Sequence, residues 1–260
     1  MNAPIIPQEP PFQGGVKGTV TDREARLCRR NKPSEARDEK VPPSAKSGGI
    51  PEPSPEYRLR ASFAPIRLPK PRPILVVIDL NGTMVYRPMK RNPTHIVARP
   101  HAKRFMQYCI DTFWVVVWSS ARLQNVDNMC RQLLSPQQLA RVVAVWGREH
   151  FGLAPDDFSR RVQCYKRLTS LWADPVVAAS HPDFRGGQRW NQGNTVLIDD
   201  SVEKARSEPH NLVAIPEFLG DVNERPEILP LVHDYLNELA HQSDLSTFMR
   251  TSPFLLERAV

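Results

Sequence analysis

The stretch ILVVIDLNGT at residues 74–83 decides the fold of this chain. Its first five residues are apolar and mostly β-branched, and Pro73 and Gly82 bound the run. A run of this kind is typical of a strand buried on both faces inside a parallel sheet. Asp79 follows where the strand would emerge, and ligands of open α/β sheets bind at the carboxyl ends of strands. Asp79 is therefore a candidate nucleophile or metal ligand; the alternative is that it only caps a turn.

Similar apolar runs recur along the chain and alternate with segments of helical spacing. The expected strands are 74–78, 113–118, 141–146, 195–198 and 212–215. Helices are expected at 100–111, across 126–134, at 164–172 and at 227–241, with a hairpin at 84–98 and a loop from 174 to 193. This alternation predicts an α/β domain of three layers around a mainly parallel, five-stranded sheet.

Three of the expected strands end in groups that suit phosphoryl chemistry. These groups are Asp79, Ser119 and the pair Asp199-Asp200. Lys166 comes from the helix expected at 164–172, which precedes the strand that ends in Asp199. The alternatives are an exposed helix lysine for Lys166 and, for Ser119, a strand-end hydroxyl that bonds its own backbone. The combination of three such strand ends with a lysine is stronger evidence than any single residue.

The first part of the chain differs in composition from the rest. Residues 1–73 carry 14 Lys/Arg and 8 Asp/Glu, and so hold six of the seven net positive charges; residues 1–70 hold 12 of the 26 prolines. Such a segment buries too little apolar surface to offset its ordering entropy. We therefore expect a disordered, Pro-rich basic tail at 1–70, a folded domain at 71–242 and a C-terminal extension at 243–260.

Several classes of protein are disfavoured by the sequence. No apolar run approaches the roughly 18 residues that cross a bilayer, and residues 1–11 have four prolines where a targeting helix would lie. The four cysteines form no C-x-x-C pair, which argues against zinc and for an intracellular chain. The tail lacks a dense Lys/Arg run with interleaved aromatics, so we expect no nucleic acid as a partner. A nuclear or cytoplasmic location is expected ahead of a mitochondrial one.

Taken together, these motifs resemble the haloacid dehalogenase (HAD) superfamily, whose first motif is D-x-D-x-[TV] after a buried strand. More narrowly, residues 72–240 resemble the C-terminal-domain phosphatases and NLI-interacting-factor-like proteins. The residues that carry the resemblance are Arg99-Pro100-His101, Trp118-Ser119-Ser120-Ala121, Gly147-Arg148-Glu149-His150, Tyr165-Lys166-Arg167-Leu168 and Leu197-Ile198-Asp199-Asp200-Ser201.

The resemblance implies a role for each site residue. Asp79 would attack phosphorus and form an aspartyl-phosphate, while Lys166 and Ser119 would contact the transferring oxygens. The implied ligands of Mg²⁺ are the Asp79 carboxylate, the main-chain carbonyl of Asn81, and Asp200, with Asp199 in support or bound directly. The implied phosphate-binding groups are Gly82, Thr83 and Ser120.

The departure from the family pattern is Asn81, which stands where the family has its second Asp. That Asp protonates the leaving oxygen, and an amide can neither take nor give this proton at neutral pH. Two outcomes stay open: another group does the proton work, or the domain binds phosphorylated protein without efficient hydrolysis. The second outcome includes a role like that of the phosphatase-like receptor of the mitochondrial translocase.

The expected substrate follows from the spacing of the motifs. The intervals from Thr83 to Ser119 and from Lys166 to Asp199 are too short for a large cap domain, so only the hairpin would cover the site. An open site suits a phosphoserine or phosphothreonine on a protein segment. Arg87 and Arg99, on this substrate flap, would then bind flanking acidic or phosphorylated residues.

Overall fold

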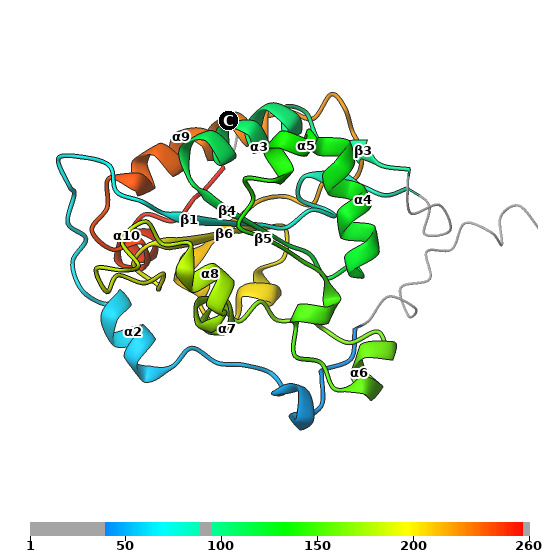
Figure 1. Ribbon diagram of the computed structural model, residues 1–260, viewed down its shortest axis with the longest axis horizontal. Coiled ribbons are helices and arrows are strands. Elements are labelled where there is room, and N and C mark those ends of the chain that lie inside the picture. Colours follow the sequence, from blue (N-terminus) through cyan, green and yellow to red (C-terminus); the bar gives the residue numbers. More distant parts are fainter. Residues whose placement is uncertain (1–39, 89–94, 257–260) are drawn as a thin grey trace, which may run out of the picture. The chain divides into compact units, whose positions relative to one another are not determined.

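A computed structural model describes residues 40–88 and 95–256. Its centre is a five-stranded sheet with the order β5-β4-β1-β6-β7 (Figure 1). Every neighbouring pair in this sheet is parallel. The strands are β1 (Leu75–Ile78), β4 (Trp114–Trp118), β5 (Ala144–Trp146), β6 (Thr195–Asp199) and β7 (Leu212–Ala214). The predicted α/β class and the parallel five-stranded sheet are confirmed.

Helices cover both faces of this sheet (Figure 1). One face carries α3 (Ala102–Thr112), α4 (Leu123–Leu133), α5 (Pro136–Leu139) and α9 (Ile228–Ala240). The other carries α7 (Leu168–Ala173) and α8 (Pro175–Ala179). The remaining helices are α2 (Pro55–Ala61), α6 (Pro155–Ser159) and α10 (Leu245–Thr251).

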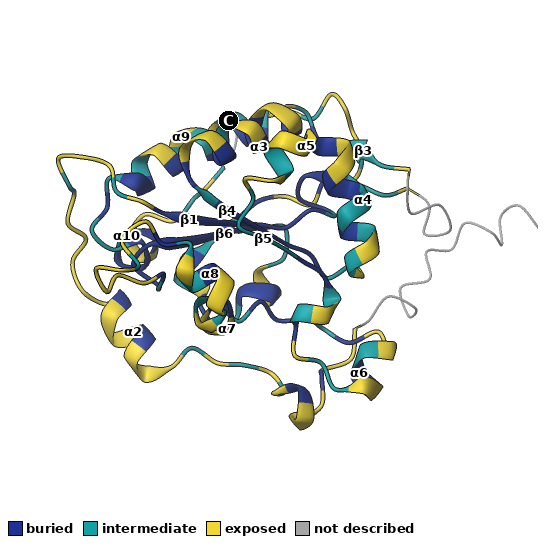
Figure 2. Ribbon diagram, viewed as in Figure 1, coloured by how far each residue is buried: buried dark blue, intermediate teal, exposed yellow. Residues whose placement is uncertain are grey.

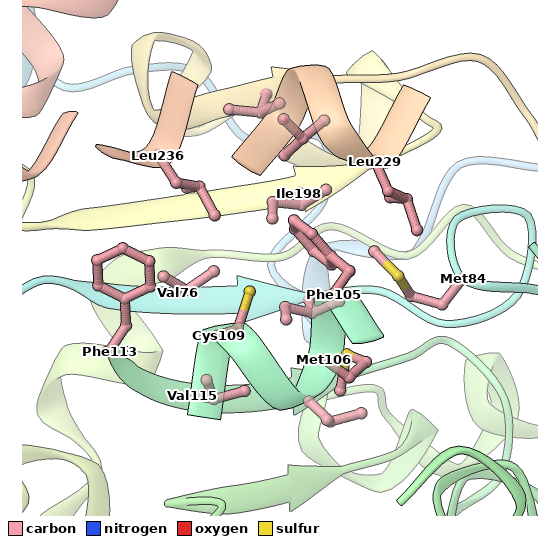
Figure 3. Close-up of a cluster of buried hydrophobic side chains, with 14 of the residues drawn as sticks. Val76, Met84, Phe105, Met106, Cys109, Phe113, Val115, Ile198, Leu229 and Leu236 are labelled. Carbon is pink, nitrogen blue, oxygen red and sulfur yellow. The ribbon is translucent and has the colours of Figure 1, made fainter. Parts of the chain in front are cut away.

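The central strand supplies side chains to both apolar layers, because successive residues of a strand point to opposite faces. Val76 and Ile78 pack with Phe105 of α3 and Leu236 of α9 in the cluster drawn in Figure 3. Leu75 and Val77 pack in a second cluster under α7 and α8. The central strands β1, β4 and β6 are almost wholly dark blue in Figure 2, as expected for strands covered on both sides, whereas the edge strands β5 and β7 are only partly buried.

The chain on both sides of the predicted domain packs on it, so the predicted boundaries at 70/71 and 242/243 are wrong. The folded unit includes residues from Lys40 onward. Tyr57 of α2 is buried and its hydroxyl donates to Asn211 Oδ1 at 2.9 Å. Leu245 of α10 is fully buried, and α10 contacts α2. Burial of a few side chains holds residues 40–70 on the domain despite their proline-rich composition. The disorder predicted for residues 1–39 lies outside the described residues.

The predicted hairpin is present as two short antiparallel strands, β2 (Val85–Tyr86) and β3 (Val97–Ala98). Residues 89–94, in the middle of the predicted hairpin, lie outside the described residues. Before β4 of the central sheet, the described part of the interval between Thr83 and Ser119 contains only this hairpin and α3. The interval between Lys166 and Asp199 contains the short helices α7 and α8 before β6. None of the helices in the described ranges is both long and apolar enough to span a membrane.

Candidate active site

The carboxyl edge of the sheet brings three carboxylates together. Asp79 directly follows β1 and its amide donates to Ile198 O at 3.0 Å, which places it level with Asp199 at the end of β6. Carboxylate oxygens of Asp79, Asp199 and Asp200 all lie within 4.8 Å of one another. Asp79 and Asp199 are buried, so their charges need partners.

Lys166 is the first of these partners. Its Nζ lies 2.9 Å from Asp79 Oδ1 and 2.6 Å from Asp199 Oδ2, and its side chain is fully buried. The prediction that it lies on a helix is wrong, since α7 begins only at Leu168. The Lys166 amide donates to Lys204 O at 2.7 Å, and the Leu168 amide to Glu208 Oε2 at 3.0 Å. These bonds hold the lysine in an extended segment that reaches the end of the sheet.

Lys204 is a second partner, and the sequence reasoning missed it. It lies on a 3₁₀ turn (Val202–Ala205) and its Nζ is 3.2 Å from Asp79 Oδ2, 2.8 Å from Asp199 Oδ1 and 3.2 Å from Asp200 Oδ1. Burial alone would lower the pKa of Lys204, but these three carboxylates raise it well above its ordinary value. The one signal was its position four residues after Asp200, which a helical turn brings to the same side.

The turn at Gly82 and Thr83 orients Asp200. Gly82 has φ +87°, and a Cβ there would lie 2.9 Å from Asp200 Oδ2. The Thr83 hydroxyl donates to Asp200 Oδ1 and accepts from the Asp200 amide, both at 3.1 Å. The amides of Gly82 and Thr83 donate to Val85 O and Leu80 O. Both amides therefore donate within the turn, and the Thr83 hydroxyl positions Asp200. Phosphate binding by Gly82 and Thr83 stays a prediction.

Asn81 is engaged by the arginine of the flap. Its Oδ1 accepts a hydrogen bond from Arg87 Nε at 3.0 Å. Burial lowers the pKa of Arg87, while the nearby charge of Asp79 raises it. The structure therefore brings Arg87, as well as Asn81, to the edge of the carboxylate cluster.

Arg99 does not face the site, so its predicted contact with substrate is wrong. It is 1% exposed, and its guanidinium forms an ion pair with Glu224 at 2.6 Å. It also donates to Thr83 O and Pro216 O, both at 2.9 Å, and lies over the ring of Phe218. Arg99 thus ties the hairpin and the turn of the first motif to the loop that follows β7.

The serines of the second motif lie at the end of β4. Ser119 is buried and its amide donates to Trp146 O at 3.0 Å, which extends the β4–β5 ladder by one residue. Ser120 is half-buried in the bend between β4 and α4. Both residues therefore reach the carboxyl edge that holds Asp79.

The donor set at this edge fits a divalent cation. The three aspartates offer hard carboxylate oxygens, which Mg²⁺ prefers, and their spacing allows several to share one ion. With Asn81 in place of an acid, residue 81 has only carbonyl oxygens to offer. The net charge of the cluster also favours a cation, because three carboxylates and the ammoniums of Lys166 and Lys204 leave one net negative charge.

Comparisons with known proteins agree with this geometry. A family model described as NLI interacting factor-like phosphatase matches residues 74–246. An FCP1 homology domain-containing protein of Schizosaccharomyces pombe is 31% identical over 195 residues, which are 69% of this chain and 77% of that protein. A ubiquitin-like domain-containing CTD phosphatase of Danio rerio is 22% identical over 180 residues, 68% of this chain.

The chain spans only about half of some of these proteins: 53% of the Danio rerio protein, and 50% of a fission yeast RNA polymerase II CTD phosphatase, Fcp1, whose structure was solved with beryllium fluoride. That structure has a TM-score of 0.38 and 13% identity over 64% of this chain. The family model itself covers most of the folded unit and includes every residue of the carboxylate cluster. The chain therefore belongs to the NLI interacting factor-like phosphatase family.

Proposed function

We propose that the chain is a Mg²⁺-dependent phosphatase of phosphoserine and phosphothreonine in protein segments, acting through an aspartyl-phosphate on Asp79 and slowed by Asn81. The observation that carries this proposal is the buried cluster in which Lys166 bridges Asp79 and Asp199. A carboxylate at a strand end with a fixed counter-charge is the arrangement that a phosphoryl-transfer nucleophile needs.

In the first half-reaction, an oxygen of Asp79 bonds to phosphorus while the bond from phosphorus to the serine or threonine oxygen breaks. Lys166 holds Asp79 in place and offsets negative charge at the phosphoryl group. A bound Mg²⁺ would supply further positive charge to the phosphoryl oxygens. In the second half-reaction, water attacks the same phosphorus, inorganic phosphate leaves and the Asp79 carboxylate is restored.

Proton transfer is the weak point of this cycle. The departing alkoxide needs a proton and the attacking water must lose one. Asn81 can assist neither step, because its amide acts as neither an acid nor a base at neutral pH. Positioned acid–base catalysis contributes about 10²–10⁴-fold, so alkyl phosphates should turn over more slowly by that order. Aryl phosphates have better leaving groups and should suffer less.

The proposed substrate class rests on the cover of the site. The described part of the flap is the short β2–β3 hairpin, and Arg87 stands between it and the cluster. A guanidinium at this place suits a phosphoryl group or a flanking acidic side chain. A protein segment can reach a site covered by a short hairpin more easily than a site covered by a large cap domain.

The decisive experiment is intact-mass spectrometry after incubation with p-nitrophenyl phosphate and Mg²⁺. The expected result is a protein species heavier by one phosphoryl group, which peptide mapping places on Asp79. The species should be absent from Asp79→Asn and present in the matched control Asp156→Asn, since Asp156 is exposed on α6. No phosphorylated species in the unaltered chain, or the same species in Asp79→Asn, would overturn the proposal.

A second function, binding of phosphorylated protein without turnover, is favoured by one observation. Both oxygens of Asp79 are already in ion pairs, with Lys166 and Lys204, and Asn81 is bonded to Arg87. On this proposal a phosphoserine peptide would bind with measurable affinity in fluorescence anisotropy, yet release no phosphate. Loss of affinity in Arg87→Met together with no phosphorylated Asp79 would support it over catalysis.

A further inference from the structure

Two lysines divide the oxygens of the carboxylate cluster between them. Lys166 contacts Asp79 Oδ1 and Asp199 Oδ2, whereas Lys204 contacts Asp79 Oδ2 and Asp199 Oδ1. Of the two, Lys204 also reaches Asp200, at 3.2 Å from Oδ1. Its ammonium thus touches all three of the clustered aspartates.

The environment of Lys204 resembles that of a bound cation more than that of a surface lysine. Its side chain is 6% exposed, and three oxygens from three different carboxylates lie within 3.2 Å of Nζ. A divalent ion at this edge would draw on the carboxylates of Asp79 and Asp200, which Lys204 contacts through Asp79 Oδ2 and Asp200 Oδ1. Two centres of positive charge held by the same carboxylates repel one another strongly where water is excluded.

We propose that the Lys204 ammonium is a resident cation of this site, which a divalent metal must displace in order to bind. The inference rests on the metal site of the proposed function. Without metal, Lys204 neutralises the cluster and holds its three carboxylates together. When a metal enters, the ammonium moves away from Asp79 Oδ2 and Asp200 Oδ1.

The proposal bears directly on the nucleophile. Lys204 and Lys166 occupy one oxygen of Asp79 each, so neither oxygen is free while both ammoniums are in place. Departure of Lys204 releases Oδ2 from its ion pair. Lys204 is therefore a positioning residue that makes the readiness of Asp79 depend on the divalent ion.

The competing explanation is that Lys204 only orients Asp199 and Asp200 for the metal. The two explanations predict opposite effects when the ammonium is removed. If it competes, the metal binds more tightly without it, because an opposing charge has gone. If it only orients, the metal binds more weakly, because its ligands lose their arrangement.

The experiment is isothermal titration calorimetry of the full chain with MgCl₂. Lys204→Met and the polar, neutral Lys204→Gln are each compared with Lys70→Met, which removes an exposed lysine near the amino end of β1. We expect the Kd for Mg²⁺ to fall by about tenfold or more in both Lys204 variants, as loss of one repulsive contact charge predicts, and to stay unchanged in Lys70→Met. Without metal, the Lys204 variants should have a lower Tm, and Mg²⁺ should raise it more than in the unaltered chain.

Folded variants of Lys204 that bind Mg²⁺ no more tightly than the unaltered chain would overturn the proposal. Variants that remain unfolded in excess Mg²⁺ would also count against it, because the metal should replace the missing charge. The outcomes that would refute the phosphatase proposal are different ones. Tighter Mg²⁺ binding in Lys204→Gln with no phosphorylated Asp79 in the unaltered chain would refute catalysis alone, whereas phosphorylated Asp79 with no change in Mg²⁺ affinity would refute only the displacement.

Discussion

Asn81 Oδ1 accepts a hydrogen bond from Arg87 Nε at 3.0 Å. Neither an amide nor a guanidinium acts as an acid or a base at neutral pH. Asp79, the proposed nucleophile, has its counter-charges, since Lys166 and Lys204 both contact it. The side that would serve the leaving group is occupied by a pair of groups that bind anions and dipoles but do not carry protons.

Restoring an acid at residue 81 should repair turnover of alkyl phosphates. We expect Asn81→Asp to raise kcat/KM on a phosphoserine peptide by about 10²–10⁴-fold, the usual contribution of a positioned acid–base group. The same change should raise the rate on p-nitrophenyl phosphate much less, because an aryl oxide leaves without protonation. Steady-state kinetics on both substrates give the measurement.

The control for this change is Asn223→Asp, an equal change of charge on an exposed loop. It should alter neither rate. Equal gains on the alkyl and aryl substrates would show that Asn81→Asp acts through charge and not through proton transfer. No gain on either would mean that a different residue carries the proton.

The sequence predicted the sheet well because its strands are continuous apolar runs. Residues 74–78 and 195–198 are fully buried, and their pattern alone identifies them. It failed where the partner of a residue is distant in the chain. Arg99 was placed on the substrate flap because nothing near it reveals its pairing with Glu224, 125 residues later. The segment 174–193, expected to be a loop, contains α8 and the buried Trp190 for a similar reason, since Trp190 packs on Trp114.

Within the site, Lys204 is another residue whose role could not be predicted, because its partners are brought to it by the tertiary fold. It follows the exposed Val202 and Glu203, in a segment whose composition is that of a solvated turn. Burial of its ammonium depends on the pairing of β1 with β6 and on the path of residues 165–168, whose amide at Lys166 bonds to Lys204 O. Residue type and spacing locate carboxylates at strand ends, but they do not reveal which cations a tertiary fold brings to them.

Gly82 should be irreplaceable for a reason beyond its positive φ. In Gly82→Ala the new Cβ would lie 2.9 Å from Asp200 Oδ2. Gly152 has φ +63° and no atom within 4 Å of the place that a Cβ would take, so it isolates the cost of the backbone conformation. We expect Gly152→Ala to lower the free energy of unfolding by about 1–2 kcal/mol, and Gly82→Ala to lower it further while weakening Mg²⁺ binding. Urea denaturation and calorimetry test this; equal losses and unchanged Mg²⁺ affinity would contradict it.

Lys166 should contribute to stability as well as to catalysis. Its ammonium is fully buried between Asp79 and Asp199. Removing one partner of a buried ion pair typically costs about 3–5 kcal/mol, because the remaining charges lose their compensation. We therefore expect Lys166→Met to lower the free energy of unfolding by that order in urea, and the exposed control Lys70→Met to change it little. A small loss in Lys166→Met would indicate that Lys204 alone neutralises the cluster.

Asp157 should make the attachment of the segment around residues 44–47 dependent on pH. Its Oδ2 accepts hydrogen bonds from the Ser47 hydroxyl at 2.6 Å and from the amide and hydroxyl of Ser44 at 2.7 Å. The Ser47 hydroxyl and then Ser44 lower the pKa of Asp157 from 3.8 to about 2. For a carboxyl whose pKa falls on folding, the stabilisation is complete above the ordinary pKa and is lost as the pH falls through the lowered value.

The segment should therefore loosen between pH 3.8 and about 2. At neutral pH, Asp157→Ala should produce the same loosening, seen as faster amide hydrogen exchange in the backbone around residues 44–49. Asp156→Ala removes the neighbouring, exposed carboxylate and should leave the exchange unchanged. The Ser44 amide is the most direct reporter, since its partner is Asp157 itself. Equal protection of that amide in Asp157→Ala and in the unaltered chain would show that the van der Waals packing of this segment, and not the carboxylate, holds it on the domain.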